Sequence, residues 1–458
     1  MDNREITPKS PAIALETPSA PAEAQRPLVS RIDADLLLSA SRRGGEPSWL
    51  TERRAQSLER FNRLGLPSLF QEEWRGTNLR SRGIANLPVA LPSATGSSGR
   101  SPVVLLEADS LIGTSGRNWP VYTHLEQALS ENPALVERFL NRSYEPDNIP
   151  SLVAQNAALT GPGAFFHVPA ASAVEQVLGA TIRPDPQMPT LFPHNVVALE
   201  EGSRAAFFED FTSDRRSAGS TFANGVTEVF VGPHAHLDIL TIIRWDDALT
   251  ANHHCVAHVA EGGTLKWHIG TLGGGMVRCD IDVFMDGPHA ESHIIGVGLG
   301  HGTQHLDHRT VQNHVAIDTR SRINFGTLLW GRSHSIYRGL INMELGALRS
   351  DAYQKNDNLI MQNGAKAQAI PMLEISTDDV KCSHGSTVGR LRDEDIFYLT
   401  SRGIPRLEAQ SLIADGFIRR VLSSAGDSSP LAEKLHRILA AKAFDMAGIS
   451  GDATCNDA

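Results

Sequence analysis

The sequence lacks several features that would assign it to common functional classes. No Gly-Lys dipeptide occurs among its 458 residues, so the phosphate-binding P-loop is absent and ATP hydrolysis is expected of another chain. Lys and Arg number 42 against 52 Asp and Glu, and the net charge of -10 argues against a general nucleic-acid surface. No apolar run reaches the ~18 residues that a membrane-spanning helix needs. We therefore expect neither nucleic acid nor a membrane as a partner.

Cysteine is also scarce. The chain has four cysteines, with no Cys-x-x-Cys pair and no even set of close spacings, at positions 255, 279, 382 and 455. Such a pattern argues against a disulfide scaffold and for a reducing compartment. We expect a cytoplasmic protein in which Cys255 is packed and Cys455 is exposed in a polar tail.

Composition divides the chain into five predicted regions. The first residues are rich in Pro, Ala, Ser and Glu, which is too polar and interrupted for a signal peptide. The predicted regions are a disordered N-terminal arm at 1–30, a helical or mixed N-terminal domain at 31–150, a β-helix core at 151–389, a C-terminal helical domain at 390–448 and a flexible tail at 449–458.

Helix signals occur near both ends of the chain. The segment from Ser48 to Leu64 carries apolar residues on one face, and Gly65 ends it. Three more helices are predicted after Gly389. The first begins at Asp393, has Ile396, Phe397 and Leu399 inside and stops at Gly403. Pro405 opens the second, with Leu412, Ile413, Phe417 and Val421 at helical spacing. The third follows Pro430, and Leu431, Leu435, Ile438 and Leu439 form its apolar stripe. This helical unit packs on its own domain or docks another protein.

The middle of the chain is rich in short strands separated by a recurring turn. In this turn a glycine is followed three residues later by alanine, as in Gly202 and Ala205, Gly232 and Ala235, Gly287 and Ala290, and Gly364 and Ala367. Gly202, Gly232 and Gly262 follow one another at intervals of 30 residues. The pattern predicts a mainly β fold, a β-solenoid with coils of variable length. A sandwich of antiparallel strands is the competing interpretation.

One strand of this region suggests a rival function. Val277 to Met285 alternates apolar and polar residues, which predicts a half-buried strand with Cys279 in the core. Asp280 and Asp282 then project from the outer face, as paired carboxylates of a carbohydrate-active β-helix enzyme would. A solvated strand face explains the pair more simply.

Histidines are concentrated in the same region. Twelve of the eighteen lie between His234 and His314, including His301, His305 and His308. In extended structure spacings of four and three place this trio on different faces, so we favour hydrogen-bonded histidines over a second metal site.

The most informative segment is Lys381-Cys382-Ser383-His384-Gly385. In an extended backbone Cys382 and His384 leave the same face with Cα atoms ~6.6 Å apart, so one iron or zinc ion could contact both. A structural metal site normally needs four ligands, so a packed Cys beside a hydrogen-bonded His is the alternative.

A longer resemblance contains this segment. The run NLIMQNGAKAQAIPMLEISTDDVKCSHGSTVGRLRDEDIFYLTSRGI, residues 358 to 404, resembles the C-terminal signature of the SufB/SufD family of the SUF iron-sulfur assembly system, on its SufD side. SufB proteins carry a Glu-containing counterpart where this chain reads Cys-Ser-His-Gly. Supporting pieces are Gln304-His305-Leu306-Asp307-His308-Arg309-Thr310, Thr227-Glu228-Val229 before Gly232, Asp351-Ala352-Tyr353-Gln354 before Asn358-Leu359, and Glu72-Glu73-Trp74-Arg75.

The resemblance implies a right-handed parallel β-helix between two helical domains. It implies a non-enzymatic scaffold that pairs with SufB, with the ATPase SufC at the C-terminal helical domain. It further implies that Cys382 and His384 lie where the two solenoids meet and contribute to an iron or nascent-cluster site. A thiolate is a soft ligand for ferrous iron, and a neutral imidazole also suits iron.

Several points stay open at this stage. No tightly bound cofactor is expected. Whether a transient iron or iron-sulfur cluster is shared with SufB, whether the complex uses reduced flavin, and whether the chain forms a homodimer without partners are open at this point. The chain departs from the family pattern at Ile370-Pro371-Met372, Arg75-Gly76-Thr77 and Ser386, none of which touches Cys382 or His384. A purely structural partner of SufB without a ligand role is a further alternative.

Overall fold

The computed structural model describes residues 28–30, 32–89, 103–107, 120–184, 189–213, 221–423 and 429–447. Most of the predicted arm at 1–30, all of the predicted tail at 449–458 and Cys455 lie outside these residues. In the described part of the chain, no helix is long and apolar enough to cross a membrane.

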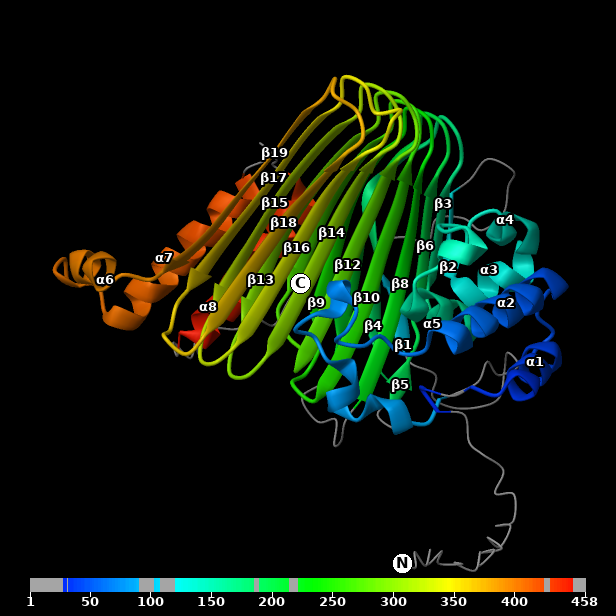
Figure 1. Ribbon diagram of the computed structural model, residues 1–458, viewed down its shortest axis with the longest axis horizontal. Helices are drawn as coiled ribbons and strands as arrows, with labels where there is room; N and C mark the ends of the chain where they lie inside the picture. Colours follow the sequence, from blue (N-terminus) through cyan, green and yellow to red (C-terminus); the bar gives the residue numbers. More distant parts are fainter. Residues whose placement is uncertain are drawn as a thin grey trace, which may run out of the picture.

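Two long sheets form the centre of the molecule and face each other (Figure 1). The first sheet has the order β1-β4-β7-β9-β11-β13-β15-β17-β19, with bounds Val103–Glu107, Ala173–Arg183, Arg204–Thr212, His236–Arg244, Thr264–Thr271, Glu291–Gly300, Arg320–Leu329, Asp351–Ile360 and Lys381–Arg390. The second has the order β18-β16-β14-β12-β10-β8-β6-β3-β2, with bounds Lys366–Ile375, His334–Met343, His305–His314, Met276–Met285, Leu249–Val259, Thr221–Val231, His194–Leu199, Ala164–Val168 and Val121–His124. The short strand β5 (Thr190–Leu191) pairs with β8.

The chain alternates between the two sheets, so each coil adds one strand to each. Pairing is parallel throughout except where β1 meets β4 and β2 meets β3. Arg204 is in register with His236, which is 32 residues later, whereas Thr264 is in register with Glu291, 27 residues later. The predicted solenoid with coils of variable length is confirmed, and the antiparallel sandwich is wrong.

The glycine-alanine pattern marks the turns between the sheets. Gly202 and Gly262 have φ of 65° and 61°, a region that favours glycine. At Gly232 a Cβ atom would lie 2.7 Å from the carbonyl oxygen of Leu199 on the preceding coil, which leaves no room for a side chain. Ala235 is fully buried behind this turn. Small residues therefore recur because consecutive turns stack closely.

The lumen between the sheets is a packed core. Inward positions of successive strands carry Val, Ile, Leu, Phe and Ala, and one contiguous cluster runs from Val104 to Tyr337. In β12, Val277, Cys279 and Ile281 are fully buried as predicted. The outer face of the same strand is buried too, because N-terminal segments cover it, so the half-buried interpretation is wrong.

The N-terminal region is helical and covers the second sheet. Its helices are α1 (Ala34–Arg43), α2 (Ser48–Leu64), α3 (Leu125–Glu131), α4 (Pro133–Glu137) and α5 (Ser151–Leu159), and a short 3-10 helix spans Glu72–Trp74. The helix predicted from Ser48 to Leu64 is confirmed, with Gly65 at φ 68° as its stop. The Glu72-Glu73-Trp74-Arg75 motif lies on the sheet, where the Trp74 ring stacks 4.0 Å from the guanidinium of Arg278.

The C-terminal region forms three helices, α6 (Asp393–Thr400), α7 (Arg406–Leu422) and α8 (Pro430–Met446). Helices α7 and α8 pack along the outer face of the first sheet, and α6 projects away from the solenoid (Figure 1). The three predicted helices are confirmed, and the apolar stripe of α8 does pack on the chain's own solenoid. The predicted burial of Phe397 is wrong, because its side chain is 72% exposed.

Candidate functional site at the last coil

The solenoid ends in a coil that has a neighbour on one side only. Strand β18 pairs with β16, and β19 pairs with β17, and each is the last strand of its sheet. The other edge of both strands therefore presents unpaired backbone groups. At the opposite end of the solenoid, the antiparallel strands β1 and β2 close the two sheets. The two ends of the stack thus differ in kind.

Cys382 and His384 lie in this last coil on one face of β19. They are in register with Ala352 and Gln354 of β17, both of which are buried and directed into the lumen. The thiol and the imidazole therefore face the inner side of the coil, as the extended backbone predicted. Because no further coil covers them, Cys382 is half-buried and His384 is exposed.

The inner side of β18 lies across the lumen and is apolar. Leu373 packs with Cys382 against a buried cluster of Ile341, Met343, Ala347 and Ala352. Ile375 on β18 and Val388 on β19 are 48% and 50% exposed. Their counterparts one coil earlier, Met343 and Asn358, are buried. The last coil therefore exposes inward positions that are buried in the coil before it.

Electrostatics keep the Cys382 thiol protonated in the isolated chain. Partial burial raises its pKa, and the carboxylate of Asp351 raises it further. Thiolate is the form that binds metals and attacks sulfur, so a nearby cation is needed to deprotonate it. This coil supplies one sulfur and one ring nitrogen, and among the described residues no cluster of three or more metal-ligating groups includes them. Such a pair holds an iron ion only if other ligands join it.

The trio of histidines is split as predicted. In β14, the imidazole Nε2 of His305 lies 2.8 Å from the hydroxyl of Thr77 in the N-terminal region. His308 points the other way, into the lumen, with Nε2 2.9 Å from the hydroxyl of Thr271. Burial lowers the pKa of both histidines to about 4. They are neutral structural groups, and His301 belongs to the turn before β14.

The two carboxylates that suggested a sugar-cleaving enzyme are structural. Asp280 accepts two hydrogen bonds from Arg278, and Asp282 accepts one from the hydroxyl of Tyr144 and one from Arg309. Both are under 7% exposed, because the N-terminal region covers this strand face, so the expectation of a solvated face is wrong. Ion pairs with Arg278 and Arg309 outweigh the effect of burial and lower both pKa values. Neither side chain can act as a general acid at an open cleft.

Sequence reasoning missed a polar cluster in the lumen. Glu209 and His253 lie next to Cys255, and their ligand atoms are all within 4.8 Å of one another. The three residues come from two different strands, β7 and β10, so no local motif reveals them. Only their inward positions in an otherwise apolar alternation carry a signal. Cys255 is buried as predicted.

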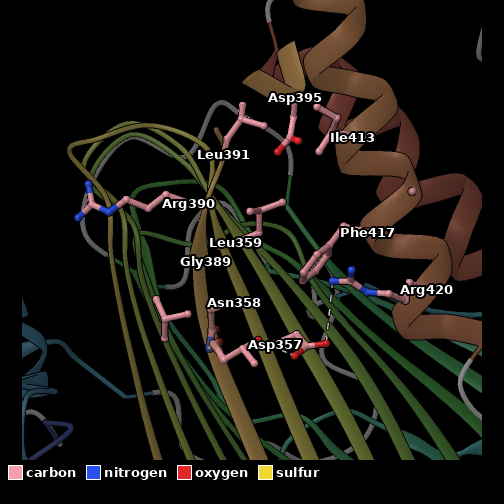
Figure 2. Close-up of a pocket in the computed structure, with 13 residues that line it drawn as sticks. Asp357, Asn358, Leu359, Gly389, Arg390, Leu391, Asp395, Ile413, Phe417 and Arg420 are labelled. Atoms are coloured by element: carbon pink, nitrogen blue, oxygen red, sulfur yellow. Dashed lines mark hydrogen bonds and ion pairs between the residues drawn. The ribbon is translucent and has the colours of Figure 1, made fainter. Parts of the chain in front are cut away.

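An open cleft of ≈ 390 Å³ lies where the last coil meets the C-terminal helices. Asp357 of β17 and Arg420 of α7 approach each other across it, with 3.9 Å between the carboxylate and guanidinium (Figure 2). Leu391 links β19 to α6 at its rim. The exposed helix α6 is thus joined directly to the strand that carries Cys382 and His384.

The comparisons with known proteins agree with this architecture. Residues 182–417, just over half of the chain, match the family described as "SUF system FeS cluster assembly, SufBD core domain". The chain is 25% identical over 413 residues to the iron-sulfur cluster assembly protein SufD of Bacillus subtilis, covering 86% of this chain and 94% of that protein. It is 28% identical over 409 residues to the SufD of Escherichia coli, covering 84% and 91%.

A mycobacterial relative is more similar over a shorter stretch. An iron-sulfur cluster assembly SufBD family protein of Mycobacterium leprae is 32% identical over 220 residues, which cover 46% of this chain and 55% of that protein. The matched core contains the coils from β7 to β19 and reaches into α7. The chain therefore belongs to the SufBD family of the SUF iron-sulfur cluster assembly system, as a SufD-type scaffold protein.

Proposed function

We propose that this scaffold pairs end to end with a SufB-type solenoid through β18 and β19. The single observation that carries the proposal is the one-sided pairing of both strands, together with the apolar inner surface that they expose. Unpaired strand edges of this length are a template for another chain, and proteins that stay monomeric protect them. A second solenoid adding its own last strands would satisfy the backbone groups and cover Ile375 and Val388.

Within that seam, Cys382 and His384 contribute ligands to iron or to the nascent cluster, which is the cargo of the complex. Two ligands on this chain hold iron weakly, and groups of the partner complete the set. A cluster held by four thiolates of one chain would be harder to pass on. Iron at the seam offsets the burial and the Asp351 charge that keep the Cys382 thiol protonated.

The C-terminal helices are the proposed contact for a SufC-type ATPase. Phe397 and Tyr398 on α6 are 72% and 57% exposed, and Leu407 and Leu412 on α7 add apolar surface. Exposed aromatic side chains are common in protein interfaces. Because α6 follows β19 directly, movement of the helices reaches the strand that carries both proposed ligands. Three described thiols, Cys255, Cys279 and Cys382, are free, which supports a cytoplasmic location.

Anaerobic reconstitution of the complex tests the ligand role. His384→Ala should abolish cluster maturation while the chain stays folded, and Cys382→Ser should have the same effect. Mössbauer spectra of the reconstituted complex measure the cluster formed with each variant. Ser383→Ala is the matched control, because Ser383 lies between the two residues and faces outward on the same strand. Normal maturation with His384→Ala would reject the ligand role. If the complex still assembles in that case, the chain is a purely structural partner.

The carbohydrate-active alternative has lost its candidate residues, since Asp280 and Asp282 are ion-paired and covered. Turnover of polysaccharide by the isolated chain would revive it. Copurification with a second solenoid and an ATPase would favour the scaffold.

A further inference from the structure

A polar cluster lies in the lumen between β7, β10 and β12, several coils before the last one. Glu209 of β7, His253 and Cys255 of β10 point inward, and all three side chains are 4% exposed or less. Cys279 of β12 lies on the neighbouring strand, in register with His253. Carboxylate, imidazole and thiolate are the donor types of tetrahedral zinc and ferrous sites.

The spacing of two of these groups fits a shared metal ion. Nε2 of His253 lies 3.5 Å from Oε1 of Glu209 and 3.2 Å from the Thr227 hydroxyl, a contact that a bound ion would replace. A zinc ion at ~2.0–2.1 Å from a nitrogen and an oxygen in tetrahedral geometry holds those two atoms ~3.4 Å apart. The Cys255 sulfur is within 4.8 Å of both atoms, so a shift of about 1 Å would bring it to bonding position.

Neighbouring side chains hold the carboxylate in place. The Thr241 hydroxyl donates to Oε1 of Glu209 at 2.6 Å, and the Thr227 hydroxyl and the Asn195 amide donate to Oε2 at 2.8 and 2.7 Å. Hydrogen bonds of this kind orient metal-binding carboxylates in known sites.

We propose that Glu209, His253 and Cys255 form a second, internal site for a divalent ion of the zinc or ferrous type, with Cys279 as a fourth ligand. Charge balance supports the assignment. One carboxylate, one thiolate and one neutral imidazole bring two negative charges to a dication, so the site is neutral, as a dry interior requires. The Cys255 thiol releases its proton to solvent when the metal-sulfur bond forms.

The ion must enter while the solenoid folds. Large side chains fill the lumen on both sides of the cluster, including Phe211 and Trp267, and the four groups are closed to solvent. Binding is then coupled to folding rather than to exchange with the finished protein. This property separates the internal site from the open pair at Cys382 and His384.

Refolding of the full chain with Co²⁺ as the probe tests the proposal. The background is Cys382→Ser with Cys455→Ser, so that Cys255 and Cys279 are the remaining thiols. Anaerobic refolding from guanidinium with Co²⁺ should give about one ion per chain that survives a chelator, with a sulfur-to-cobalt charge-transfer band. Adding Co²⁺ after refolding should give no band, and zinc should be found in the chain as isolated from cells.

Variants identify the ligands. Cys255→Ser should abolish the charge-transfer band, Cys279→Ser should weaken it, and Glu209→Gln should lower retention of the ion at least tenfold. If Cys255→Ser does not fold, the metal content and spectrum of the background protein decide the question. A background protein that refolds to native circular dichroism without a band, or an undiminished band in folded Cys255→Ser, would overturn the proposal. Cys382 is absent from this background and no partner is present, so the result does not depend on the proposed pairing or on the proposed ligands of the last coil.

Discussion

The middle coils and the last coil of this solenoid are built alike but behave differently. In both, inward side chains alternate with outward ones along parallel strands in register. Around β12, another coil lies on each side and the N-terminal region covers the outer face, so almost every side chain is buried. In β19, which has one neighbour, almost every side chain is exposed. The number of neighbours, rather than the strand itself, decides whether a residue stabilises the fold or is available to a partner.

The largest difference in stability between the middle coils and the last coil is expected when a buried charge is removed. Arg278 is 1% exposed and forms ion pairs with Asp280 at 2.8 Å and Asp307 at 3.0 Å. Arg278→Ala should lower the free energy of unfolding by about 3–5 kcal/mol, because it leaves the buried Asp280 without its ion pair and Asp307 with Arg338 alone. The matched change in the last coil, Arg390→Ala, should stay within about 0.5 kcal/mol. Urea unfolding followed by near-UV circular dichroism checks both, and similar losses would break the comparison.

A pH effect of nearly the same size is expected from the buried histidines. Burial lowers the pKa of His308 from 6.5 to about 4, against a smaller opposing effect of Asp307. The unfolded chain therefore binds more protons between those values, so stability is complete above pH 6.5 and falls as the pH drops towards 4. His308→Gln removes this titration and should reduce the loss over that window by about 3 kcal/mol.

Unfolding midpoints of the wild type and His308→Gln at several pH values measure that slope. If the two profiles run parallel between pH 6.5 and 4, His308 does not titrate as its burial requires.

Removal of a single methyl group compares the same two regions with a smaller expected change in stability. Ile281 in β12 is fully buried, whereas Ile375 in β18 is 48% exposed. Ile281→Val should lower the free energy of unfolding by about 0.5–1.5 kcal/mol, because it leaves a small cavity in packed surroundings. Ile375→Val removes the same group from a half-open surface and should cost less than about 0.5 kcal/mol. Equal effects in denaturant titrations would mean that the last coil is covered in the isolated chain.

The smallest effect on stability should accompany a large effect on pairing. Ile375→Lys places a charge on the open inner surface, where it stays solvated, so unfolding should change by less than about 0.5 kcal/mol. Copurification with a SufB-type partner should nevertheless be lost, since the proposed seam would bury that charge. Ile370→Lys, at a 42% exposed site on the outer face of the same strand, is the control. Retained pairing in Ile375→Lys would exclude this coil from the interface.

Much of the fold could be predicted because it depends on local signals. Helix α2 begins and ends at the predicted residues, and Gly403, Pro405 and Pro430 separate the C-terminal helices as expected. Alternation and recurring small turn residues were enough for the solenoid. Burial of outer faces could not be predicted in this way. Asp280 and Asp282 have the pattern of a solvated face. Two segments that are distant in sequence, one around Trp74 and one around Tyr144, cover them.

The proposed ligand residues show the same contrast between local and long-range signals. Cys382 and His384 are two residues apart on one strand, so the sequence was sufficient to place them on one face. Glu209 and His253 are 44 residues apart, and their 3.5 Å separation exists only because β7 and β10 belong to facing sheets of one lumen. A sequence carries no direct signal for such a meeting.

The sequence by itself determined the repeating pattern of strands and turns and the positions of the helices. Alternating strands, small turn residues and helix stops act over a few residues, through backbone geometry and side-chain size, and they specify a coiled stack with helical ends. Only the tertiary structure decided which faces are covered, which carboxylates are ion-paired and which coil is left open. These properties depend on contacts between segments far apart in the chain, and burial and charge pairing acquire their energies only when those segments meet.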